Sequence, residues 1–407
     1  MDRPLSHLRV LDLTRILAGP WAAQTLADLG AEVIKIERPK SGDDTRSWGP
    51  PWLKGADRAD TREAAYFLSV NRGKKSVTVD LSKPDGQRLV RDLAAKSDVL
   101  IENYKVGDLA RYGLAYDDVR RVNPSIIYCS VTGFGQDGPY AQRPGYDFVF
   151  QGMCGLMSIT GERDELPGGG PQKVGIAVTD VLTGMYASLA ITAAIAHRQL
   201  TGAGQYIDLA LLDTLVAFNA NSILNYWCSG EVPKRYGNAH PNIVPYEVFP
   251  SADGHIILAV GNDTQFASFC RVAGRPELAT DPRFRTNPER VKHRPVLVPI
   301  VQDIVRQRKS RDWIEHLEAA SVPCGPINDM EEVFEDPHVR HRGLRVEIPH
   351  PSGVPCPTVA SPMRFSTTPV DHGVPPPLLG QHTHEVLGHV LGLNADEIAA
   401  LAASGVI

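Results

Sequence analysis

The sequence predicts an α/β protein with a doubly wound, mainly parallel sheet and a second, smaller α+β domain. Between residues 8 and 134, short apolar segments rich in β-branched residues alternate with segments of helical periodicity. This alternation is typical of parallel strands joined by right-handed crossovers. After residue 236 the composition shifts toward turn residues followed by further helices. With 407 residues, 43% of them hydrophobic, the chain is large enough for two domains.

The expected elements follow this pattern along the chain. We expect strands at residues 8–13, 31–37, 75–81, 98–103, 125–133 and 205–212, and helices at 19–30, 84–97, 181–197 and 213–227. In the smaller domain we expect a hairpin in "VFPSADGHIILAV" and helices at 264–274 and 294–320. The proline-rich segment 343–380 is expected to be extended, and helices at 382–392 and 395–403 end the chain.

These elements suggest four regions. We expect a large sheet domain over residues 1–205, a linker helix region over 206–235, the small domain over 236–330, and a return linker with C-terminal helices over 331–407 that packs on the large domain.

Composition excludes several classes of protein. The net charge is -5 with both signs interspersed, so nothing indicates a nucleic-acid-binding domain or a basic membrane-surface helix. The six cysteines show no metal-ligand spacing, which indicates reduced thiols and a cytoplasmic protein. The longest nearly apolar run, Val181 to Ala196, has 16 residues, fewer than the roughly 20 that span a bilayer. We therefore expect a buried helix there and no membrane partner.

Two motifs that would indicate other cofactors are incomplete. The turn "TRILAGP" after the first strand lacks the G-x-G-x-x-G of a dinucleotide site, so NAD is not expected. In "HTHEVLGH", His384 and His389 are five residues apart, about 140° around a helix, which disfavours a shared metal ion. No metal is expected.

Cationic and amide side chains recur where strands are predicted to end. In doubly wound sheets ligands lie beyond the carboxyl ends of the strands, so we expect these side chains at one rim, where they would suit a polyphosphate. An alternative is an ordinary solvated surface. The group consists of Arg38, Asn71, Arg72, Lys74, Lys75, Asn103, Lys105 and Arg111.

One carboxylate, Asp180, begins the apolar stretch "VGIAVTDVLTGMYASLAI". The simplest interpretation is that Thr179 or Asp180 is the N-cap of the helix 181–197. The alternative is that the helix N-terminus keeps Asp180 ionised and stabilises a developing oxyanion. With a reference pKa near 3.9, an aspartate is ~1,000:1 carboxylate at pH 7 and needs no neighbouring base to act as a nucleophile.

Seven blocks of sequence together resemble the class III coenzyme A transferase family, which includes formyl-CoA transferase. They are "LRVLDLTRILAGPWAAQTLADLGAEVIKIERP", "YFLSVNRGKKSVTVDL", "IENYKVGDLARYGL", "SVTGFGQDGPY", "AVTDVLTGMYA", "SVPCGPINDM" and "PPPLLGQHTHEVL". The resemblance covers essentially the whole chain. It implies a Rossmann-like domain, a smaller domain and an interlocked homodimer.

The resemblance also implies an activity and a mechanism. The family's nucleophilic aspartate corresponds to Asp180, which would pass through aspartyl anhydride and aspartyl-CoA thioester intermediates without a metal. Coenzyme A would be the co-substrate. Its implied contacts are Ile16, Ala18, Arg38, the block Asn71, Arg72, Lys74 and Lys75, then Asn103, Tyr104, Lys105 and Arg111.

Departures from the family pattern indicate the branch and the substrate. Leu17 replaces a glutamine that helps formyl-CoA transferase hold oxalate, so oxalate is disfavoured. Tyr146 stands where the related α-methylacyl-CoA racemases carry a catalytic histidine. The blocks "GDDTRSWGPP", "QRPGYD" and "HPNIVPYEVF" are most similar to the succinate–glutarate (hydroxymethylglutarate) CoA-transferase branch.

For this branch we expect transfer of coenzyme A from a dicarboxylyl-CoA such as succinyl-CoA to a small acid. The alternatives are a racemase-like acyl-CoA isomerase and a non-catalytic acyl-CoA-binding protein. The substrate candidates are Leu17, Arg46, Trp48, Arg143, Tyr146, and Gly237 and His240 of the loop "GNAHP".

Overall fold

The computed structural model describes residues 3–407, and the chain divides into two compact units. The larger unit consists of Met1–Gly155, Val174–Ala220 and Pro337–Ile407. The smaller consists of Leu156–Lys173 and Asn221–Asp336. The smaller unit is therefore an insertion into the larger one.

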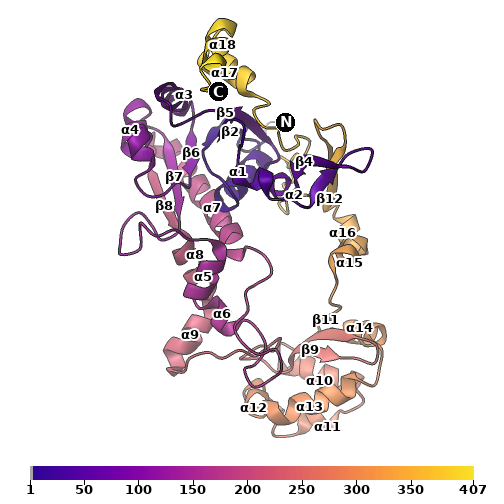
Figure 1. The fold of residues 1–407 in the computed structure, drawn as a ribbon. Helices are drawn as coiled ribbons and strands as arrows, with labels where there is room; N and C mark the ends of the chain where they lie inside the picture. Colours follow the sequence, from indigo (N-terminus) through magenta and orange to yellow (C-terminus); the bar gives the residue numbers. More distant parts are fainter. Residues whose placement is uncertain (1–2) are drawn as a thin grey trace. The chain divides into compact units, whose positions relative to one another are not determined.

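A six-stranded sheet with every neighbouring pair parallel forms the centre of the larger unit (Figure 1). Its order is β5-β2-β1-β6-β7-β8. The strands are β1 (Arg9–Asp12), β2 (Glu32–Glu37), β5 (Lys74–Thr78), β6 (Val99–Glu102), β7 (Ile127–Thr132) and β8 (Tyr206–Ala210). The predicted doubly wound parallel sheet is confirmed. Because the strand order reverses between β1 and β6, their carboxyl ends border the crevice where such sheets bind ligands.

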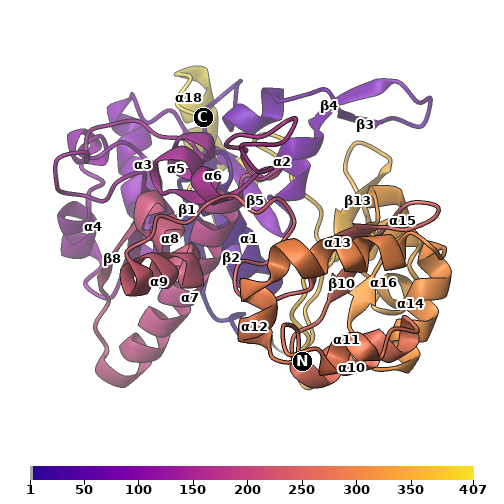
Figure 2. The same cartoon turned by 90° about the horizontal axis from the view of Figure 1, so that it is seen from below.

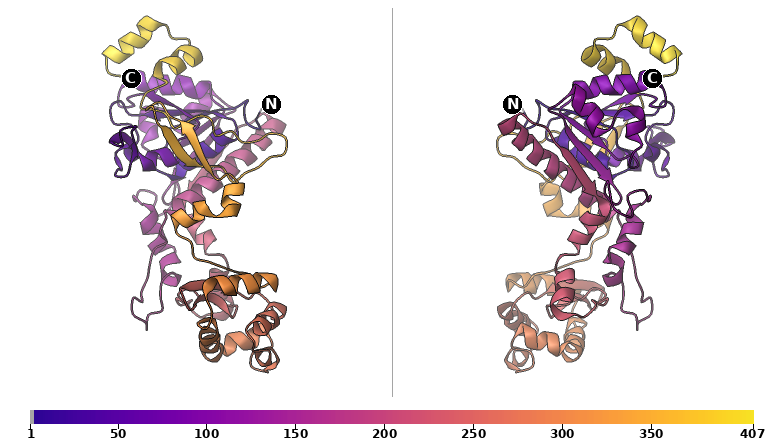
Figure 3. Two further views of the ribbon diagram at one scale, coloured as in Figure 1. Left: turned by 90° about the vertical axis from the view of Figure 1, so that its right-hand side faces the viewer. Right: turned by 90° about the vertical axis from the view of Figure 1, so that its left-hand side faces the viewer.

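Helices cover both faces of this sheet (Figures 1 and 3). Helices α1 (Ala18–Asp28) and α7 (Val178–Thr201) pack against each other and contact the sheet on one face. On the other face, α3 (Pro84–Ala95), α4 (Tyr116–Val122) and α17 (Thr383–Leu391) bury their apolar stripes. Leu11, Ile34 and Leu100 of adjacent strands point into that second core, as the two-residue period of a strand requires.

Helix α7 is longer than the sequence run suggested. It has 24 residues, and its length and composition match those of a membrane-spanning helix. One such helix is equally typical of a buried core helix, and α7 packs along α1 and β7. Gly184 permits this close packing, because a Cβ there would lie 2.6 Å from the carbonyl oxygen of Ala18.

Smaller elements of the larger unit surround the sheet. They are η1 (Asp44–Ser47), β3 (Trp52–Lys54), β4 (Asp60–Ala64), α2 (Ala65–Ser69), η2 (Leu109–Tyr112), α5 (Asp147–Met153), α8 (Leu211–Phe218), α16 (Pro337–His341), β12 (Arg345–Pro349), β13 (Pro355–Val359) and α18 (Ala395–Ala403). The pair β12–β13 is an antiparallel hairpin inside the segment expected to be only extended. The hairpin β3–β4 was not predicted.

The smaller unit contains an antiparallel sheet with the order β11-β10-β9. Several helices surround it, of which Figure 2 labels α10 to α14. The predicted hairpin is confirmed as β9 (Tyr246–Pro250) and β10 (His255–Ala259), and β11 is Cys324–Gly325. The helices are α6 (Leu156–Ile159), α9 (Ala220–Ser229), α10 (Asp263–Val272), α11 (Glu277–Thr280), α12 (Asn287–Lys292), α13 (Arg294–Val305), α14 (Ser310–Ala319) and α15 (Met330–Glu335). Two predicted helices are each broken in two: 213–227 into α8 and α9, and 294–320 into α13 and α14.

Candidate active site

The turn that follows β1 is held by buried ion pairs. Lys74 Nζ lies 3.0 Å from Asp12 Oδ2, and both side chains are fully buried. Lys35 Nζ lies 2.9 Å from Asp43 Oδ2, also fully buried, and donates to the Thr14 carbonyl. These pairs fix the backbone that carries the chain from β1 into α1.

Two side chains from other elements then shape residues 15 and 16. Asn103, directly after β6, accepts a hydrogen bond from the Arg15 N–H and donates one to the Arg15 carbonyl, at 2.9 and 2.8 Å. Ile16 has φ of +74°, a conformation that a β-branched residue rarely adopts. The Ile16 N–H points at both carboxylate oxygens of Asp43, each 3.3 Å away. The strained turn is therefore held by side chains from two other segments of the chain.

Asp180 lies in the first turn of α7, beside the N-terminus of α1. Helix α7 begins at Val178, its N-cap is Ala177, and no side chain caps it. The prediction that Thr179 or Asp180 is the N-cap is therefore wrong. Instead, the backbone N–H of Ala18 in the adjacent helix lies close enough to the Asp180 carboxylate to lower its pKa. Two helix N-termini thus meet at one carboxylate.

The pKa of Asp180 is higher than the sequence suggests. Burial, and next the nearby Asp147 carboxylate, raise the pKa of Asp180 to about 7, although the Ala18 N–H opposes them. About half of the molecules would carry the carboxylate at pH 7. The expectation that the helix end keeps Asp180 fully ionised is wrong, because desolvation and the like charge of Asp147 are stronger.

Asp147 itself is held firmly at the start of α5. Its Oδ1 accepts the Thr179 N–H at 2.8 Å, and its Oδ2 accepts from Gln151 Nε2 at 2.7 Å. Gln151 is fully buried and also accepts the Val174 N–H. The segment that leads into α7 is therefore tied to α5.

The sequence reasoning missed Tyr66, on α2. Burial and then the charge of Asp180 raise the pKa of Tyr66 to about 12, which places its hydroxyl within electrostatic reach of that carboxylate. The Tyr66 ring meets Trp48 edge-on at 5.0 Å, so the predicted pocket wall Trp48 adjoins this region. The signal was the "Y" of "YFLSVNRGKKSVTVDL", a block of which only Asn71 and the cations were predicted to contact a ligand.

Arg38, Lys105 and Arg111 of the predicted cationic rim lie near the crevice between β1 and β6, together with Arg15, which was not predicted. Arg15 and Arg38 both bind Asp44, each at 2.8 Å. Arg15 also lies over the Tyr104 ring, 5.7 Å from its centroid. Lys105 and Arg111 are exposed on the segment that follows β6. With Asn103 and the turn residues Ile16 and Ala18, this edge combines exposed cations, an aromatic face and backbone N–H groups.

The block of residues 71–75 lies elsewhere, because β5 starts at Lys74 and runs parallel to β2. Arg72 and Lys74 are buried in pairs with Asp28 and Asp12, and Asn71 accepts from Lys74. Lys75 binds Glu32, the first residue of β2. The expectation that this block shares the carboxyl rim is wrong.

The predicted substrate residues of the larger unit differ in whether their side chains are available to bind a substrate. The Arg46 guanidinium donates two hydrogen bonds of 2.8 Å to the Glu37 carboxylate and lies 3.6 Å from the centroid of the Phe67 ring. Because these contacts occupy the guanidinium group, it is not available to bind a substrate carboxylate. Arg143 stacks on Tyr140, at 4.4 Å, and is exposed.

The other two candidates, Leu17 and Tyr146, differ in exposure. Tyr146 is exposed and precedes Asp147, whereas Leu17 is buried at the N-cap of α1.

Gly237 and His240 belong to the smaller unit. Gly237 has φ of +60°, and a Cβ there would lie 2.8 Å from Glu162 Oε1. The His240 carbonyl accepts from Arg294 at 2.6 Å, and burial, then Arg294, lower the pKa of the His240 ring. Arg294 therefore ties down the base of the predicted loop. Among residues 3–407, no group of three or more His, Cys, Asp or Glu side chains is arranged to hold a metal ion.

The sequence matches the family model of CoA-transferase family III over residues 5–383. It is 50% identical to a succinate–glutarate CoA-transferase of Agrobacterium fabrum over 387 residues, 95% of this chain and 96% of that protein. It is 44% identical to the human succinyl-CoA:glutarate CoA-transferase over 409 residues, 100% of this chain and 90% of that one. A crystal structure of a CAIB/BAIF family protein from Brucella suis superposes with a TM-score of 0.83 at 46% identity, covering 96% of this chain and 100% of that one.

Proposed function

Because the chain belongs to CoA-transferase family III, and so moves coenzyme A between acids, we propose that its donor is succinyl-CoA or a similar dicarboxylyl-CoA and its acceptor a small dicarboxylic acid. The names of the relatives support this choice, since two of them are transferases acting on succinyl and glutaryl groups. The observation that carries the mechanism is the single carboxylate of Asp180 at two converging helix N-termini.

We propose that Asp180 transfers the coenzyme in four balanced steps. Its carboxylate oxygen attacks the thioester carbon, the C–S bond breaks, and a mixed anhydride and coenzyme A thiolate form. The thiolate attacks the aspartyl carbonyl, which releases succinate and leaves an aspartyl-CoA thioester. The acceptor carboxylate then attacks this thioester to give a second anhydride and free thiolate. The thiolate finally attacks the acceptor's acyl carbon and restores the Asp180 carboxylate.

The surroundings of Asp180 suit these steps. The Ala18 N–H and the positive end of α7 offer stabilisation to the oxyanions formed at each attack. The pKa of about 7 makes the carboxylate a stronger nucleophile than an ordinary aspartate, while about half of it is still ionised at neutral pH. Each step exchanges acyl groups of similar energy, so the sequence of steps requires no external energy source.

The coenzyme is proposed to lie along the crevice between β1 and β6, with its phosphates near Arg15, Arg38 and Arg111. Guanidinium groups suit phosphate oxygens, and the Tyr104 ring offers a stacking face for a base. A homodimer is also proposed. Met185, Tyr186 and Leu189 on α7 and Trp227 on α9 are exposed apolar side chains, as expected of surfaces that a second copy covers.

The test is to trap the intermediate. The protein is incubated with succinyl-CoA, quenched with hydroxylamine, digested, and the peptide of residues 174–198 sequenced by mass spectrometry. A hydroxamate on Asp180 is expected, and it should be absent when free succinate replaces succinyl-CoA. Turnover of succinyl-CoA and glutarate to glutaryl-CoA with Asp180 unmodified under all quench conditions would overturn the covalent mechanism but leave the transferase activity standing.

The racemase alternative has a separate readout. In the structure Tyr146 is exposed, and its phenol group is not the imidazole base that the racemases carry at this position. Loss of the α-deuterium from a 2-deuterated acyl-CoA, without acyl transfer, would favour that alternative.

A further inference from the structure

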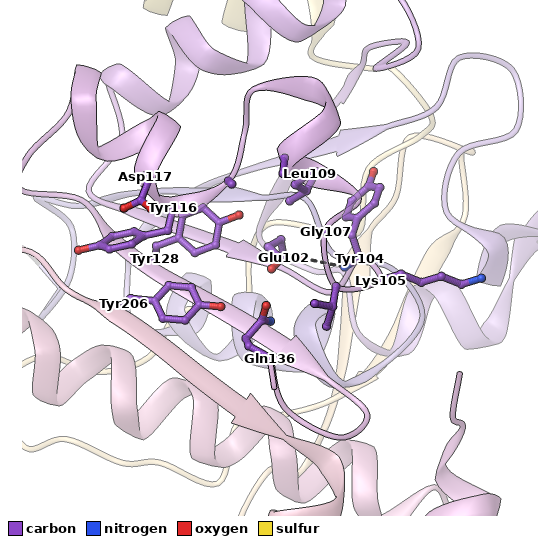
Figure 4. Close-up of a pocket in the computed structure, with 13 residues that line it drawn as sticks. Glu102, Tyr104, Lys105, Gly107, Leu109, Tyr116, Asp117, Tyr128, Gln136 and Tyr206 are labelled. Carbon is purple, nitrogen blue, oxygen red and sulfur yellow. Dashed lines mark hydrogen bonds between the residues drawn. The ribbon is translucent and has the colours of Figure 1, made fainter. Parts of the chain in front are cut away.

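A second pocket opens on the larger unit, apart from Asp180 (Figure 4). Its volume is about 440 Å³, and it lies between the segment that follows β6 and the strands β7 and β8. We name it the tyrosine pocket. The side chains that matter here are Glu102, Tyr116, Asp117, Tyr128, Gln136 and Tyr206.

Glu102 at the base of the tyrosine pocket is a buried acid without a cation. It is 6% exposed, and its Oε2 accepts the Tyr104 N–H at 2.8 Å. Ser130, whose oxygen accepts from Gln136 Nε2 at 2.7 Å, donates to the same carboxylate. Within residues 3–407 no Lys, Arg or His forms an ion pair with Glu102. Two donors leave about half of the carboxylate's lone pairs unused.

The charged groups around Glu102 do not supply the missing positive charge. Burial, and to a lesser degree the Asp208 carboxylate, raise the pKa of Glu102 to about 7. Lys105 lies at the rim, but its side chain is exposed and points away from the tyrosines (Figure 4). The titratable groups that interact electrostatically with Glu102 are Asp208 on β8, Cys129 and Tyr128 on β7, Tyr206 on β8 and Tyr104 after β6. None of them is a cation.

Three aromatic rings form one wall of the pocket. Tyr116 lies 5.8 Å from Tyr128 and 5.2 Å from Tyr206, and the last two rings are 5.7 Å apart. Tyr128 donates its hydroxyl to the Leu114 carbonyl, which fixes the orientation of its ring. Aromatic faces attract cations, and Asp117 at the rim adds further negative potential.

We propose that the tyrosine pocket binds a small organic cation, with an ammonium group against Glu102 and an aliphatic part against the three tyrosine rings. The pocket has about the volume of a site for a small ligand. Because the Glu102 carboxylate has no cationic partner, a positively charged ligand would stabilise it more than a neutral ligand would. Tyr104, which borders the proposed coenzyme crevice, also lines the tyrosine pocket, so a cation there would lie beside that crevice. The proposal does not depend on the donor or acceptor of the transfer reaction.

Isothermal titration calorimetry on the full chain tests the proposal, with n-butylammonium chloride as the probe and 1-butanol as its uncharged counterpart. Butylammonium is expected to bind saturably at pH 8 and 1-butanol is not. Because only ionised Glu102 attracts the cation and its pKa is about 7, the affinity should be about tenfold lower at pH 6 than at pH 8. This comparison uses the wild-type protein and needs no variant to fold.

Variants then locate the site. Glu102→Gln keeps the shape and an acceptor for the Tyr104 N–H but loses the charge, so the affinity should fall about tenfold or more. Tyr206→Leu should weaken binding about two- to fivefold. The matched control is Glu231→Gln, an exposed acid of the smaller unit, which should bind as the wild type does.

Four results would overturn the proposal. The first is equal binding of butylammonium and 1-butanol. The second is an affinity that does not change between pH 6 and pH 8, and the third is wild-type affinity in a folded Glu102→Gln protein. Stronger binding of a neutral planar probe such as adenosine, lost in Glu102→Gln, would also overturn it, because it would assign the pocket to an uncharged ring.

Discussion

The larger unit buries acidic side chains in two settings, and the two differ in what faces the carboxylate. Burial alone would raise the pKa of Asp12 and Asp43, but Lys74 and Lys35 outweigh it, and the pKa of Asp43 falls to about 2. At Asp180, burial acts together with a second acid, Asp147, and the pKa rises to about 7. The paired acids fix the backbone of the turn, whereas the acid without a cation can change its protonation state at neutral pH.

The comparison teaches that burial alone does not distinguish a structural acid from a reactive one. The charge of the nearest neighbour does so, because it decides whether desolvation is compensated. Four substitutions test this difference, in order of decreasing expected effect.

Asp180→Asn should reduce the transfer of coenzyme A by about 10³-fold or more, because the amide cannot form an anhydride. The rate is measured by chromatography of the acyl-CoA products. The matched control is Asp213→Asn, which changes an exposed acid at the equivalent position in the first turn of α8 and should leave the rate unchanged. Substantial activity in folded Asp180→Asn protein would place the nucleophile elsewhere.

Lys74→Met should destabilise the larger unit by about 3–5 kcal/mol, because it leaves Asp12 buried without its cation. Chemical denaturation followed by fluorescence measures the loss. Arg88→Met, which breaks an exposed pair with Asp85, should change stability little. Equal, small effects of the two substitutions would mean that the buried pair does not hold the turn.

Gly184→Ala should lower the yield of trapped intermediate roughly 10- to 100-fold, because the new Cβ would lie 2.6 Å from the Ala18 carbonyl oxygen and displace the Ala18 N–H from Asp180. Hydroxamate formation at a fixed time measures the effect. At Gly175 a Cβ would meet no atom within 4 Å, so Gly175→Ala serves as the control in the segment before α7. Normal trapping by Gly184→Ala would show that the Ala18 contact is dispensable.

Asp147→Asn should shift the pH dependence of kcat/KM downward by about 0.5–1 pH unit. Asp180 has a raised pKa, so the reactive carboxylate accumulates as pH rises through about 7 in the wild type. Removing the like charge lets it ionise at lower pH, which should increase relative activity at pH 6. The asparagine keeps an oxygen for the Thr179 N–H.

The control for this shift is Asp137→Asn, an exposed acid on the loop before α5, which should keep the midpoint near 7. An upward shift or none in Asp147→Asn would show that burial alone sets the pKa of Asp180.

Much of the fold followed from the sequence because hydrophobic period and turn residues are local signals. The six parallel strands and the β9–β10 hairpin lay within a few residues of their predicted positions. The hairpin β12–β13 was not predicted, because Pro349, Pro355 and Pro357 interrupt the residue pattern that is typical of strands. A two-stranded sheet has only edges, where proline is tolerated.

The site was predicted less completely because its geometry depends on distant segments. Asp180 was singled out from its place before an apolar run, but the acid that raises its pKa, Asp147, lies 33 residues away in the sequence. The cations of the block 71–75 looked like ligand contacts, since the sequence does not show that Asp12 and Asp28 neutralise two of them in the interior.

The discontinuity of the larger unit bears on how the chain folds during synthesis. Arg72 bonds to Thr358 and Val359, Lys75 to Glu385, and the Ser76 N–H to His382, so the sheet's outer strand is completed by residues made last. The inserted unit is a continuous stretch except for Leu156–Lys173, and it can fold while the ribosome is still adding residues. The larger unit cannot be completed until residues 337–407 have been synthesised. Until then the edge of β5 is exposed, so chaperones can bind there and other strands can pair with it incorrectly.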